Sequence, residues 1–393
     1  MLRLTHSTQR YAWGSATAIP ALLGIEPDGS PLAEAWFGAH SSAPAMAGDQ
    51  PLDQLIATSG DDVLGEGVVG RFGPTLPYLL KLIAADHPLS LQVHPHIERA
   101  RAGYAQEDAA GVPLDAPNRS YRDRNHKPEL VYALTQFEAL CGFRAPRRAA
   151  ELFAGLDVPL AKELHGILAD EPSADGIRAV FEQLLHPTTR PGPDEVREIA
   201  EACAARLAAG SPSPRSDRTV VLLQKEYPGD LGVVTSLLLN PVTLKPGEAL
   251  FVPAGGVHAY LSGLAVEIMA SSDNVLRAGL TPKHVDVPEL LDNVDYVAAP
   301  PIRIAPETFY DATKVFYAPV DDFELSVTEI DDADEHPLPG RGPRIVLCLS
   351  GRVTLTSAED SGVLDQGQSV FVPASDGPLT VSGSGTIVQA DVP

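Results

Sequence analysis

The stretch SLQVHPH, residues 90–96, places side chains that can bind a metal or a sugar at every second position. If this stretch is a β-strand, Ser90, Gln92 and His94 share one face, while the apolar residues between them point the other way. Pro95 interrupts this alternation before His96. The stretch alone therefore leaves two candidate ligand pairs open: Gln92 with His94, or His94 with His96.

Three other segments carry residues that could join such a site. They are NHKPEL (125–130), PAGGVHAYL (253–261) and EIMASSDNVLRAGLTPKH (267–284), the last expected to be largely loop. Their polar and charged candidates are Asn125, Lys127, Glu129, His258, Glu267, Asp273, Asn274, Arg277 and Lys283. Imidazole nitrogens with carboxylate and amide oxygens suit an open divalent-metal site, and zinc fits such a mixed set. Each residue alone has an ordinary explanation as a surface or core side chain, but the four segments together predict one metal site.

Other kinds of active site lack their motifs. The sequence contains no glycine-rich dinucleotide motif after a strand, no Walker A loop, no HExxH and no GxSxG. Its three cysteines, Cys141, Cys203 and Cys348, are widely spaced among apolar neighbours, and their odd number fits no disulfide framework. We therefore expect reduced, buried thiols in a cytoplasmic protein.

Charge and length bound the class of protein. A formal net charge of −23 over 393 residues argues against nucleic-acid binding, which needs clustered cations. A small phosphorylated substrate needs only a few local cations. No apolar run approaches the ~20 residues of a membrane-spanning helix, and the N-terminus lacks the apolar core of a signal peptide. The expectation is a cytoplasmic protein of two or three domains, without membrane or nucleic-acid partners.

The elements that would position these residues fall into four segments. Residues 1–145 are expected to be β-dominated, and residues 146–217 show amphipathic-helix spacing that ends in a linker, SPSPRSD (211–217). Strand patterns return in residues 218–290, including TVVLLQKEY and GVVTSLLLN, and continue as short β runs through residues 291–393. We predict a mainly β protein with a jelly-roll catalytic domain built from the first and third segments. A helical insertion divides it, and a jelly-roll domain follows at the C-terminus.

A weak internal repeat supports two β domains. KPGEALFVPAGG (245–256) resembles DQGQSVFVPASDG (365–377), because each has a glycine turn, a strand ending in Phe-Val and then a Pro-Ala corner. Only the first copy continues to a histidine, His258. We therefore predict that the C-terminal domain has no metal site of its own.

These motifs also resemble those of a known family. GEALFVPAGGVH, ending at His258, resembles the second conserved motif of the cupin superfamily. LSLQVHP, NHKPEL, FVPAGGVHAYL and SSDNVLRAGLTPKH together resemble the type I phosphomannose isomerases, as do YAWGS and EAWFGAH near the N-terminus. The resemblance extends from Tyr11 to Asp286, and the C-terminal third matches only in being β-rich.

The resemblance implies a zinc-dependent enzyme that interconverts mannose 6-phosphate and fructose 6-phosphate through a cis-enediolate. It implies one zinc per subunit, with the ligands Gln92, His94, Glu129 and His258. It also implies a pocket whose residues contact sugar or phosphate, namely Ser90, Lys81, Lys127, Arg277 and Lys283. His96 then becomes a residue of the pocket rim.

The resemblance implies the catalytic groups as well, which are Arg277, Glu267, Lys127 and Asp273. Glu267 is the first candidate for the base that removes the C2 proton. Asp273 and Lys127 are candidates for ring opening or proton transfer. Residues 97–124, which separate the first two motifs, are expected to shape the pocket rim or a lid.

Two rival functions remain open at this point. One is another cupin enzyme, such as an iron-dependent oxygenase that uses His94 and His96 with a carboxylate. The other is a non-catalytic sugar-binding cupin, which would not need Lys127, Arg277 and Lys283 around a metal. The only partner that we expect is a small-molecule sugar phosphate, and the expected state is a monomer.

Overall fold

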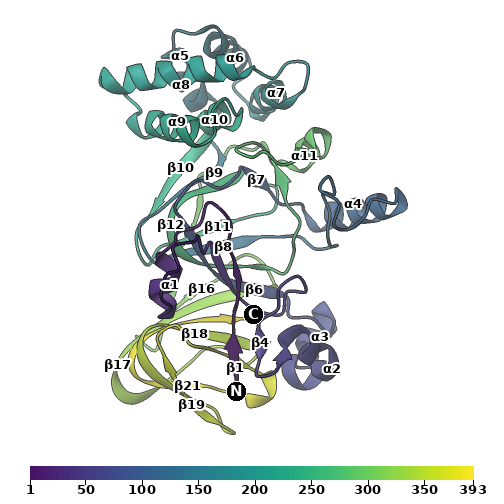
Figure 1. Cartoon of the computed structure of the whole chain (residues 1–393), viewed down its shortest axis with the longest axis vertical. Coiled ribbons are helices and arrows are strands. Elements are labelled where there is room, and N and C mark those ends of the chain that lie inside the picture. Colours follow the sequence, from purple (N-terminus) through teal and green to yellow (C-terminus); the bar gives the residue numbers. More distant parts are fainter.

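The chain is arranged in three tiers along its longest axis (Figure 1). This computed structural model describes residues 1–331 and 334–393 with their side chains. Helices gather at one end, an 11-stranded antiparallel sheet lies in the middle, and a 10-stranded antiparallel sheet lies at the other end. The predicted fold class, mainly β with two β domains and a helical insertion, is confirmed.

The middle tier is built from strands of both the first and the third sequence segments. They are β2 (Ser7–Gln9), β3 (Glu34–Phe37), β6 (Tyr78–Ala85), β7 (Gln92–Val93), β8 (Glu129–Ala133), β9 (Phe137–Phe143), β10 (Leu239–Leu244), β11 (Ala249–Val252), β12 (His258–Ala270), β13 (Leu276–Arg277) and β14 (Ile302–Ile304). Glu267 therefore lies within a long strand, as the strand pattern of LAVEIMASS (264–272) predicts, and the loop part of its segment begins after Ala270.

Strand β12 joins the two halves of the middle sheet. Its first half pairs with β7 and β9, and its second half pairs with β6 and β8. At the bend between them, Gly263 has a φ of 118°, and a Cβ there would lie 2.6 Å from the carbonyl oxygen of Gln136. Only glycine fits this position, so the strand can fold over and enclose the interior of a sandwich.

The C-terminal tier forms the second sheet. Its strands are β1 (Leu2–Thr5), β4 (Met46–Ala47), β5 (Gln50–Pro51), β15 (Glu307–Phe309), β16 (Thr313–Phe316), β17 (Glu324–Pro337), β18 (Arg344–Thr356), β19 (Ser361–Asp365), β20 (Ser369–Val372) and β21 (Thr380–Asp391). β1, β4 and β5 belong to this sheet although they come from the start of the chain, because β1 pairs with β20. The repeated FV-P-A motif forms β11 in one tier and β20 in the other.

β6 and β12 are buried on both faces because they separate two cores. Leu82 and its register partner Val266 point toward the C-terminal sheet, where they belong to one apolar core with Phe371. The neighbouring register pair, Lys81 and Glu267, points to the opposite side, into the first sandwich. The C-terminal domain thus supports from behind the two strands that carry candidate site residues.

The helices of the top tier are α5 (Pro146–Ala154), α6 (Pro159–Asp170), α7 (Ala174–Leu185), α8 (Pro193–Ala208), α9 (Pro214–Glu226) and α10 (Gly232–Thr235), followed by the 3₁₀ helix η1 (Ser236–Leu238). The strand predictions for TVVLLQKEY and for most of GVVTSLLLN are wrong, and SPSPRSD is not simply a linker, because Pro214 begins α9. Val220 and Leu223 are buried whereas Val221 and Leu222 are exposed, which is helical spacing. The GVVTSLLL segment is buried all round, so its pattern could not distinguish helix from strand.

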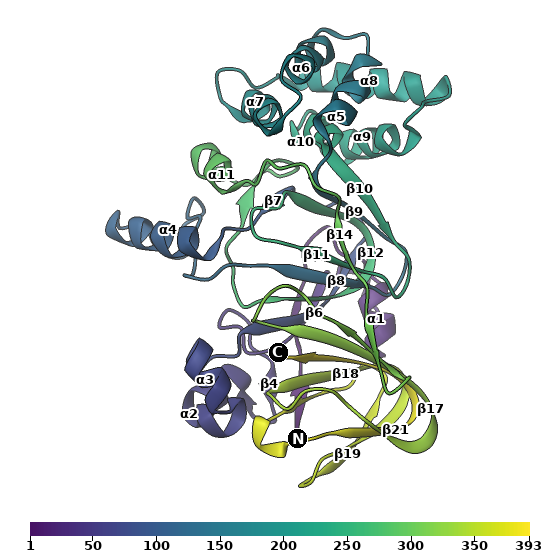
Figure 2. The same cartoon turned by 180° about the vertical axis from the view of Figure 1, so that it is seen from behind.

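Helices also interrupt the first 145 residues, which we had predicted as β-dominated. They are α1 (Ala18–Leu23), α2 (Leu52–Leu64), α3 (Glu66–Phe72) and α4 (Ile97–Ala109). α4 projects from the side of the middle tier, near α11 (Val287–Asn293), as Figure 2 shows. A 3₁₀ turn, η2 (Ala374–Asp376), completes the helical elements. The exact domain division remains a prediction, but the helices clearly extend beyond residue 217.

A buried carboxyl group lies near the contact between the two β domains. The Tyr78 hydroxyl lies 2.9 Å from the carbonyl oxygen of Pro343 and 3.2 Å from that of Ala390. The adjacent Asp391 is 1% exposed, and its Oδ2 makes no hydrogen bond within the described residues. Burial raises the pKa of Asp391 to about 7, although the Val392 N–H and Arg344 act in the opposite direction. Between pH 3.8 and about 7, the Asp391 carboxyl group therefore keeps a proton in the folded protein that it releases in the unfolded chain.

Replacing Asp391 with asparagine is expected to stabilise the protein increasingly as the pH rises. The wild type loses the stability linked to this proton between pH 3.8 and about 7, whereas an amide does not titrate. The stability difference between variant and wild type should grow across that window by about 1–4 kcal/mol. Denaturant unfolding at pH 5 and pH 8 measures it. Asp365→Asn, at an exposed ion pair with Arg352, is the control, and an equal pH trend in both variants would contradict the assignment.

Candidate active site

The four chemically active segments meet inside the first sandwich. A cavity of about 40 Å³ is lined by residues of β3, β6, β7, β8 and β12 and by two loop residues, Leu89 and Lys127. The strand residues are Glu34, Lys81, Ile83, Gln92, Glu129, His258, Ala259, Tyr260 and Glu267. This volume holds an ion or a water molecule but not a sugar. A substrate would therefore place only its reacting end here and extend toward the mouth.

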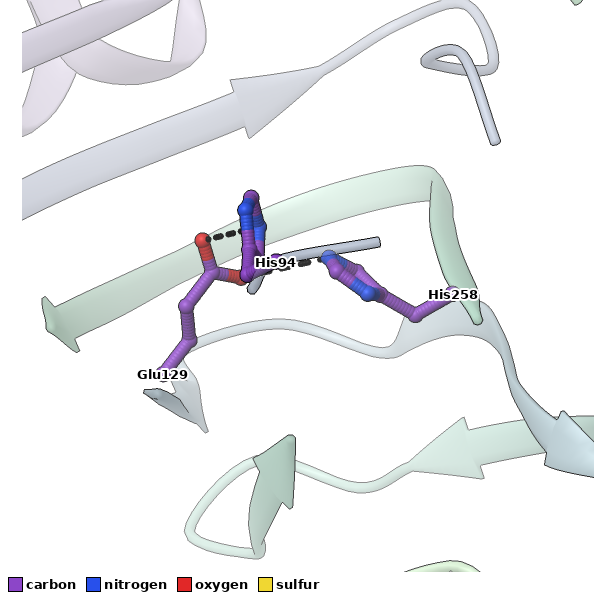
Figure 3. A group of neighbouring side chains, drawn as sticks. All are labelled: His94, Glu129 and His258. Atoms are coloured by element: carbon purple, nitrogen blue, oxygen red, sulfur yellow. Dashed lines mark ion pairs between the residues drawn. The ribbon is translucent and has the colours of Figure 1, made fainter. Parts of the chain in front are cut away.

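His94, Glu129 and His258 form the centre of the site (Figure 3). Nε2 of His94 lies 3.0 Å from one carboxylate oxygen of Glu129, and Nε2 of His258 lies 3.3 Å from the other. One potential ligand atom from each residue lies within 4.8 Å of the others, and all three side chains are buried. Two nitrogens and a carboxylate oxygen that converge in this way can hold a divalent metal.

Backbone carbonyls orient both imidazole rings. Nδ1 of His94 lies 2.7 Å from the carbonyl oxygen of Asn274, and Nδ1 of His258 lies 3.0 Å from that of Gly256. When Nδ1 donates its hydrogen, the lone pair of Nε2 is left for a metal, as in most histidine-metal sites.

The protonation and hydrogen bonding of the His94 ring indicate whether a metal ion fits this site. Burial lowers the pKa of His94 to about 4, and the charge of Lys127 adds to this effect, so the ring is neutral. Its Nε2 is buried and makes no hydrogen bond within the described part of the chain. A neutral, buried acceptor aimed at a carboxylate is unfavourable without a cation between them, so these residues fit a metal ion.

Glu129 is held by two further donors. Its Oε2 accepts a hydrogen bond of 3.0 Å from the Tyr260 hydroxyl, and its Oε1 lies 3.1 Å from the Lys127 ammonium. Burial opposes ionisation, yet the charge of the Lys127 ammonium lowers the pKa of Glu129 well below its ordinary value. Glu129 is therefore an anion oriented by its neighbours.

Tyr260→Phe tests this orientation directly. The variant removes one hydrogen bond to Glu129 and leaves the proposed ligands in place, so metal affinity should fall by about 10–100-fold, as for other residues that orient ligands. Competition with a chelator measures the affinity. Tyr132→Phe is the matched control because Tyr132 is also buried but belongs to the core shared with the C-terminal sheet. Equal affinity in the two variants would show that the Tyr260 hydrogen bond does not support the site.

Gln92 and His96, the two alternative partners of His94, lie in different places. Gln92 lines the cavity and is the register partner of His258 between β7 and β12. Its amide nitrogen donates to the Ser90 hydroxyl at 3.3 Å, so both residues face the same side, as strand alternation predicts. His96 is exposed and precedes α4. This arrangement favours Gln92 over His96 as a ligand, and ligation by Gln92 remains a prediction.

A layer of ion pairs lies beside the metal ligands. The Lys81 ammonium is 3.3 Å from Glu267 and 3.8 Å from Glu34, and Trp36 Nε1 donates to Glu34 at 2.6 Å. Burial disfavours charge on Lys81, but Glu34, Glu267 and Glu129 together raise its pKa, so it stays an ammonium. Burial and Glu129 raise the pKa of Glu267, while Lys81 opposes this shift. Glu267 is thus a buried carboxyl group whose pKa is raised above its ordinary value.

The remaining predicted residues lie outside the cavity lining. Asp273 is partly exposed, and its Oδ1 lies 3.6 Å from Nε2 of His40. Arg277 is the register partner of Gln92 between β13 and β7, and Lys283 lies further along the same segment. Burial lowers the pKa of both Arg277 and Lys283, and the charge of Arg277 lowers that of Lys283 further. The buried His–Glu–His group and its carboxylate neighbours are therefore separate from these three residues, none of which lines the cavity.

Sequence reasoning missed several residues that the structure brings to the site. They are Glu34 and Tyr260, which line the cavity, and Asp123, which accepts a hydrogen bond from the Asp273 N–H. Tyr260 could have been found, because strand alternation places it on the same face as His258. Glu34 lies in EAWFGAH, which contributed only to the family resemblance, and no local pattern indicates that it faces Lys81.

The jelly-roll sandwich and its buried His–Glu–His group define a metal-binding cupin. The catalytic-domain model of phosphomannose isomerase type I matches residues 1–146, and the cupin-domain model of mannose-6-phosphate isomerase matches residues 312–392. The chain is 40% identical to mannose-6-phosphate isomerase of Escherichia coli (strain K12) over 99% of each chain. It is 32% identical to mannose-6-phosphate isomerase 2 of Arabidopsis thaliana over 98% of this chain and 92% of that relative.

Solved structures agree with the sequence relatives. Crystal structures of mannose 6-phosphate isomerase bound with zinc and yttrium, and of the apo form from Salmonella typhimurium, match with a TM-score of 0.89 at 38% identity. Each match covers 99% of this chain and 98% of the other. The chain therefore belongs to the type I phosphomannose isomerase family. Among the described residues, no helix has the length and apolar character needed to cross a membrane.

Proposed function

We propose that this protein interconverts mannose 6-phosphate and fructose 6-phosphate with the help of one zinc ion per subunit. The observation that carries the proposal is the buried His94–Glu129–His258 group beside the Lys81–Glu267 pair. Gln92 would complete the zinc ligands from the adjacent strand. The family relatives carry this enzyme name, and one related structure is bound with zinc and yttrium.

The charges of the site suit this reaction. Three buried carboxylates, of Glu34, Glu129 and Glu267, face two ammonium groups, of Lys81 and Lys127. A divalent metal makes this group net positive, and it supplies charge that stabilises the oxyanion of an enediolate more than the uncharged sugar. The site therefore favours the charge that develops during isomerisation.

Glu267 is the residue best suited to move the proton between C2 and C1. It is 3% exposed, lines the cavity and has a raised pKa because of its burial. A carboxylate in this state can remove the C2 proton and return it to C1. Lys127, with its ammonium beside Glu129, can donate a proton to a sugar oxygen during ring opening. Asp273 is less suited to either step because its side chain faces His40.

An activity assay on protein whose zinc content has been measured tests the proposal. Purified protein with stoichiometric zinc should convert mannose 6-phosphate to fructose 6-phosphate in a coupled assay, and should incorporate solvent deuterium at C2 or C1. Absence of interconversion by the zinc-loaded protein would refute it. Oxygen consumption with an iron-loaded sample would instead favour the oxygenase function, which the position of His96 already disfavours.

We also propose a cytoplasmic location and a monomeric state. Cys141, Cys203 and Cys348 are buried and free, and burial raises the pKa of each thiol. Such thiols are inert packing residues that fit a reducing compartment. Size-exclusion chromatography with light scattering tests the monomeric state.

A further inference from the structure

A second, much larger cavity lies where the helical tier joins the middle sheet (Figure 1). Its volume is about 710 Å³, and its walls come from α5, the end of α8, the turn before α9, β10 and the segment of residues 298–301 that leads to β14. The small cavity beside the candidate metal ligands has a separate set of lining residues. Pockets of about 300–1,000 Å³ commonly hold small organic molecules, so the larger cavity has the size of a ligand site.

The lining of this cavity combines an apolar surface with an excess of positive charge. The apolar part comes from Leu152 and from the alanines and prolines of residues 298–301. The charged lining residues are one glutamate, Glu151, and three arginines, Arg144, Arg148 and Arg206. The protein as a whole has a formal charge of −23, so this local excess of cations runs against its average.

Two of the three arginines are paired with carboxylates. Arg206 binds the buried Asp217 through Nε at 3.0 Å and through Nη2 at 2.6 Å, so its charge is balanced. Arg148 lies 2.7 Å from Glu151, but both side chains are exposed, so this pair is weak and can rearrange around a ligand. The net positive charge of the pocket therefore depends on Arg144.

Arg144 has no carboxylate partner among the described residues. Its Nε donates to the carbonyl oxygen of Leu237 at 3.0 Å and its Nη2 donates to the Ser216 hydroxyl at 2.9 Å, while its Nη1 makes no hydrogen bond within the same part of the chain. These neutral acceptors orient the guanidinium without balancing its charge. Burial lowers the pKa of Arg144 to about 10, and the charge of Arg215 adds to this effect. A half-buried cation in this state is suited to an external anion.

Hydrogen bonds and ring stacking hold one wall of the pocket in place. Nδ2 of Asn240, a lining residue, donates to the carbonyl oxygen of Ala299 at 3.2 Å and to that of Phe143 at 2.9 Å. The Phe143 ring stacks on the Tyr296 ring, with centroids 5.9 Å apart. The segment before β14 is therefore attached to the end of β9, and a ligand would meet a preformed pocket.

We propose that this cavity binds an organic acid that carries one oxyanion group on an apolar body. Arg144 and Arg148 would hold the oxyanion, and the alanines and prolines of residues 298–301 would contact the apolar body. The proposal does not depend on the isomerase function, because the pocket lies apart from the candidate metal ligands. An occupant would contact both the helical tier and β10 of the middle sheet, and would stabilise their association.

Fluorescence titration of the metal-loaded protein with 8-anilinonaphthalene-1-sulfonate tests this proposal, because the probe carries one sulfonate on an aromatic body. The wild type should bind one probe molecule per chain. Arg144→Met should raise the Kd about 10-fold, because a charged hydrogen-bonding group is lost, and Arg144→Lys should restore part of the affinity. The neutral probe N-phenyl-1-naphthylamine, which lacks the sulfonate, should bind about 10-fold more weakly than the anionic probe.

Arg148→Met and Arg147→Met form a matched pair of variants on α5. Both arginines are exposed, but only Arg148 lines the cavity. Arg148→Met should raise the Kd of the sulfonate probe about 2–5-fold, whereas Arg147→Met should leave it unchanged. Substitutions at exposed positions seldom affect folding, so this pair decides the question even if Arg144→Met does not fold.

The inference is overturned if the Arg144 and Arg148 variants bind the sulfonate probe like the wild type, or if the neutral and anionic probes bind equally well. It is also overturned if mannose 6-phosphate displaces the probe, because the probe would then occupy the active site. Activity is a separate measurement. A protein that binds the probe through Arg144 but does not isomerise mannose 6-phosphate keeps the pocket and refutes the proposed function.

Discussion

Glu129→Gln is expected to abolish stoichiometric metal binding and to reduce kcat/KM by about 10³-fold, which corresponds to about 4 kcal/mol. Glu129 contributes the anionic oxygens between the two histidines and is the centre of four contacts, with His94, His258, Lys127 and Tyr260. The amide keeps the shape but removes the charge that balances a cation. It also leaves the buried Lys127 ammonium without its nearest carboxylate.

Elemental analysis and the coupled isomerase assay measure the two effects on the same sample. Glu138→Gln is the matched control, because Glu138 lies in β9 of the same sheet but pairs with Arg215 near the surface. The control should keep both metal and activity. A Glu129→Gln protein that retained stoichiometric zinc would contradict the assignment of Glu129 as a ligand.

Glu267→Gln should reduce kcat by about 10²–10⁴-fold while the metal content stays unchanged. The variant removes the proposed base but none of the proposed ligands, so kcat should fall while the metal content does not change. Exchange of the C2 proton with solvent deuterium should disappear together with turnover, because the proposed base transfers that proton.

Asp273→Asn provides the comparison with the rival base. If Glu267 is the base, Asp273→Asn should retain measurable deuterium exchange. If exchange persists in Glu267→Gln and disappears in Asp273→Asn, the roles must be reversed. Loss of metal in Glu267→Gln would instead show that Glu267 acts through the structure of the metal site.

The structure brings the candidate metal ligands together from separate segments, and their roles remain predictions. His94, Glu129 and His258 come from three separate segments. In the structure, one potential ligand atom from each of them lies within 4.8 Å of the others. Strand alternation also placed Gln92 beside Ser90 correctly. The strand pattern of LAVEIMASS, which contains Glu267, is confirmed as part of β12, because the apolar residues around Glu267 fill two cores.

The helical region shows the limit of local patterns. Residues 219–227 are rich in Val and Leu, so they resemble a strand, yet their buried positions follow helical spacing against the other helices. Tertiary packing decides between these two structures, since a short apolar run fits either. The helices therefore continue past the predicted boundary at residue 217.

The sequence by itself predicted the types of candidate ligand, the family of folds and the segments that carry His94, Glu129 and His258. Only the tertiary structure decided which charges meet. It placed Glu34 and Glu267 beside Lys81 and gave Glu129 its Tyr260 partner. These contacts join segments that are far apart in the chain, so a local sequence pattern cannot predict them. Burial of these groups in the folded protein then shifts their pKa values.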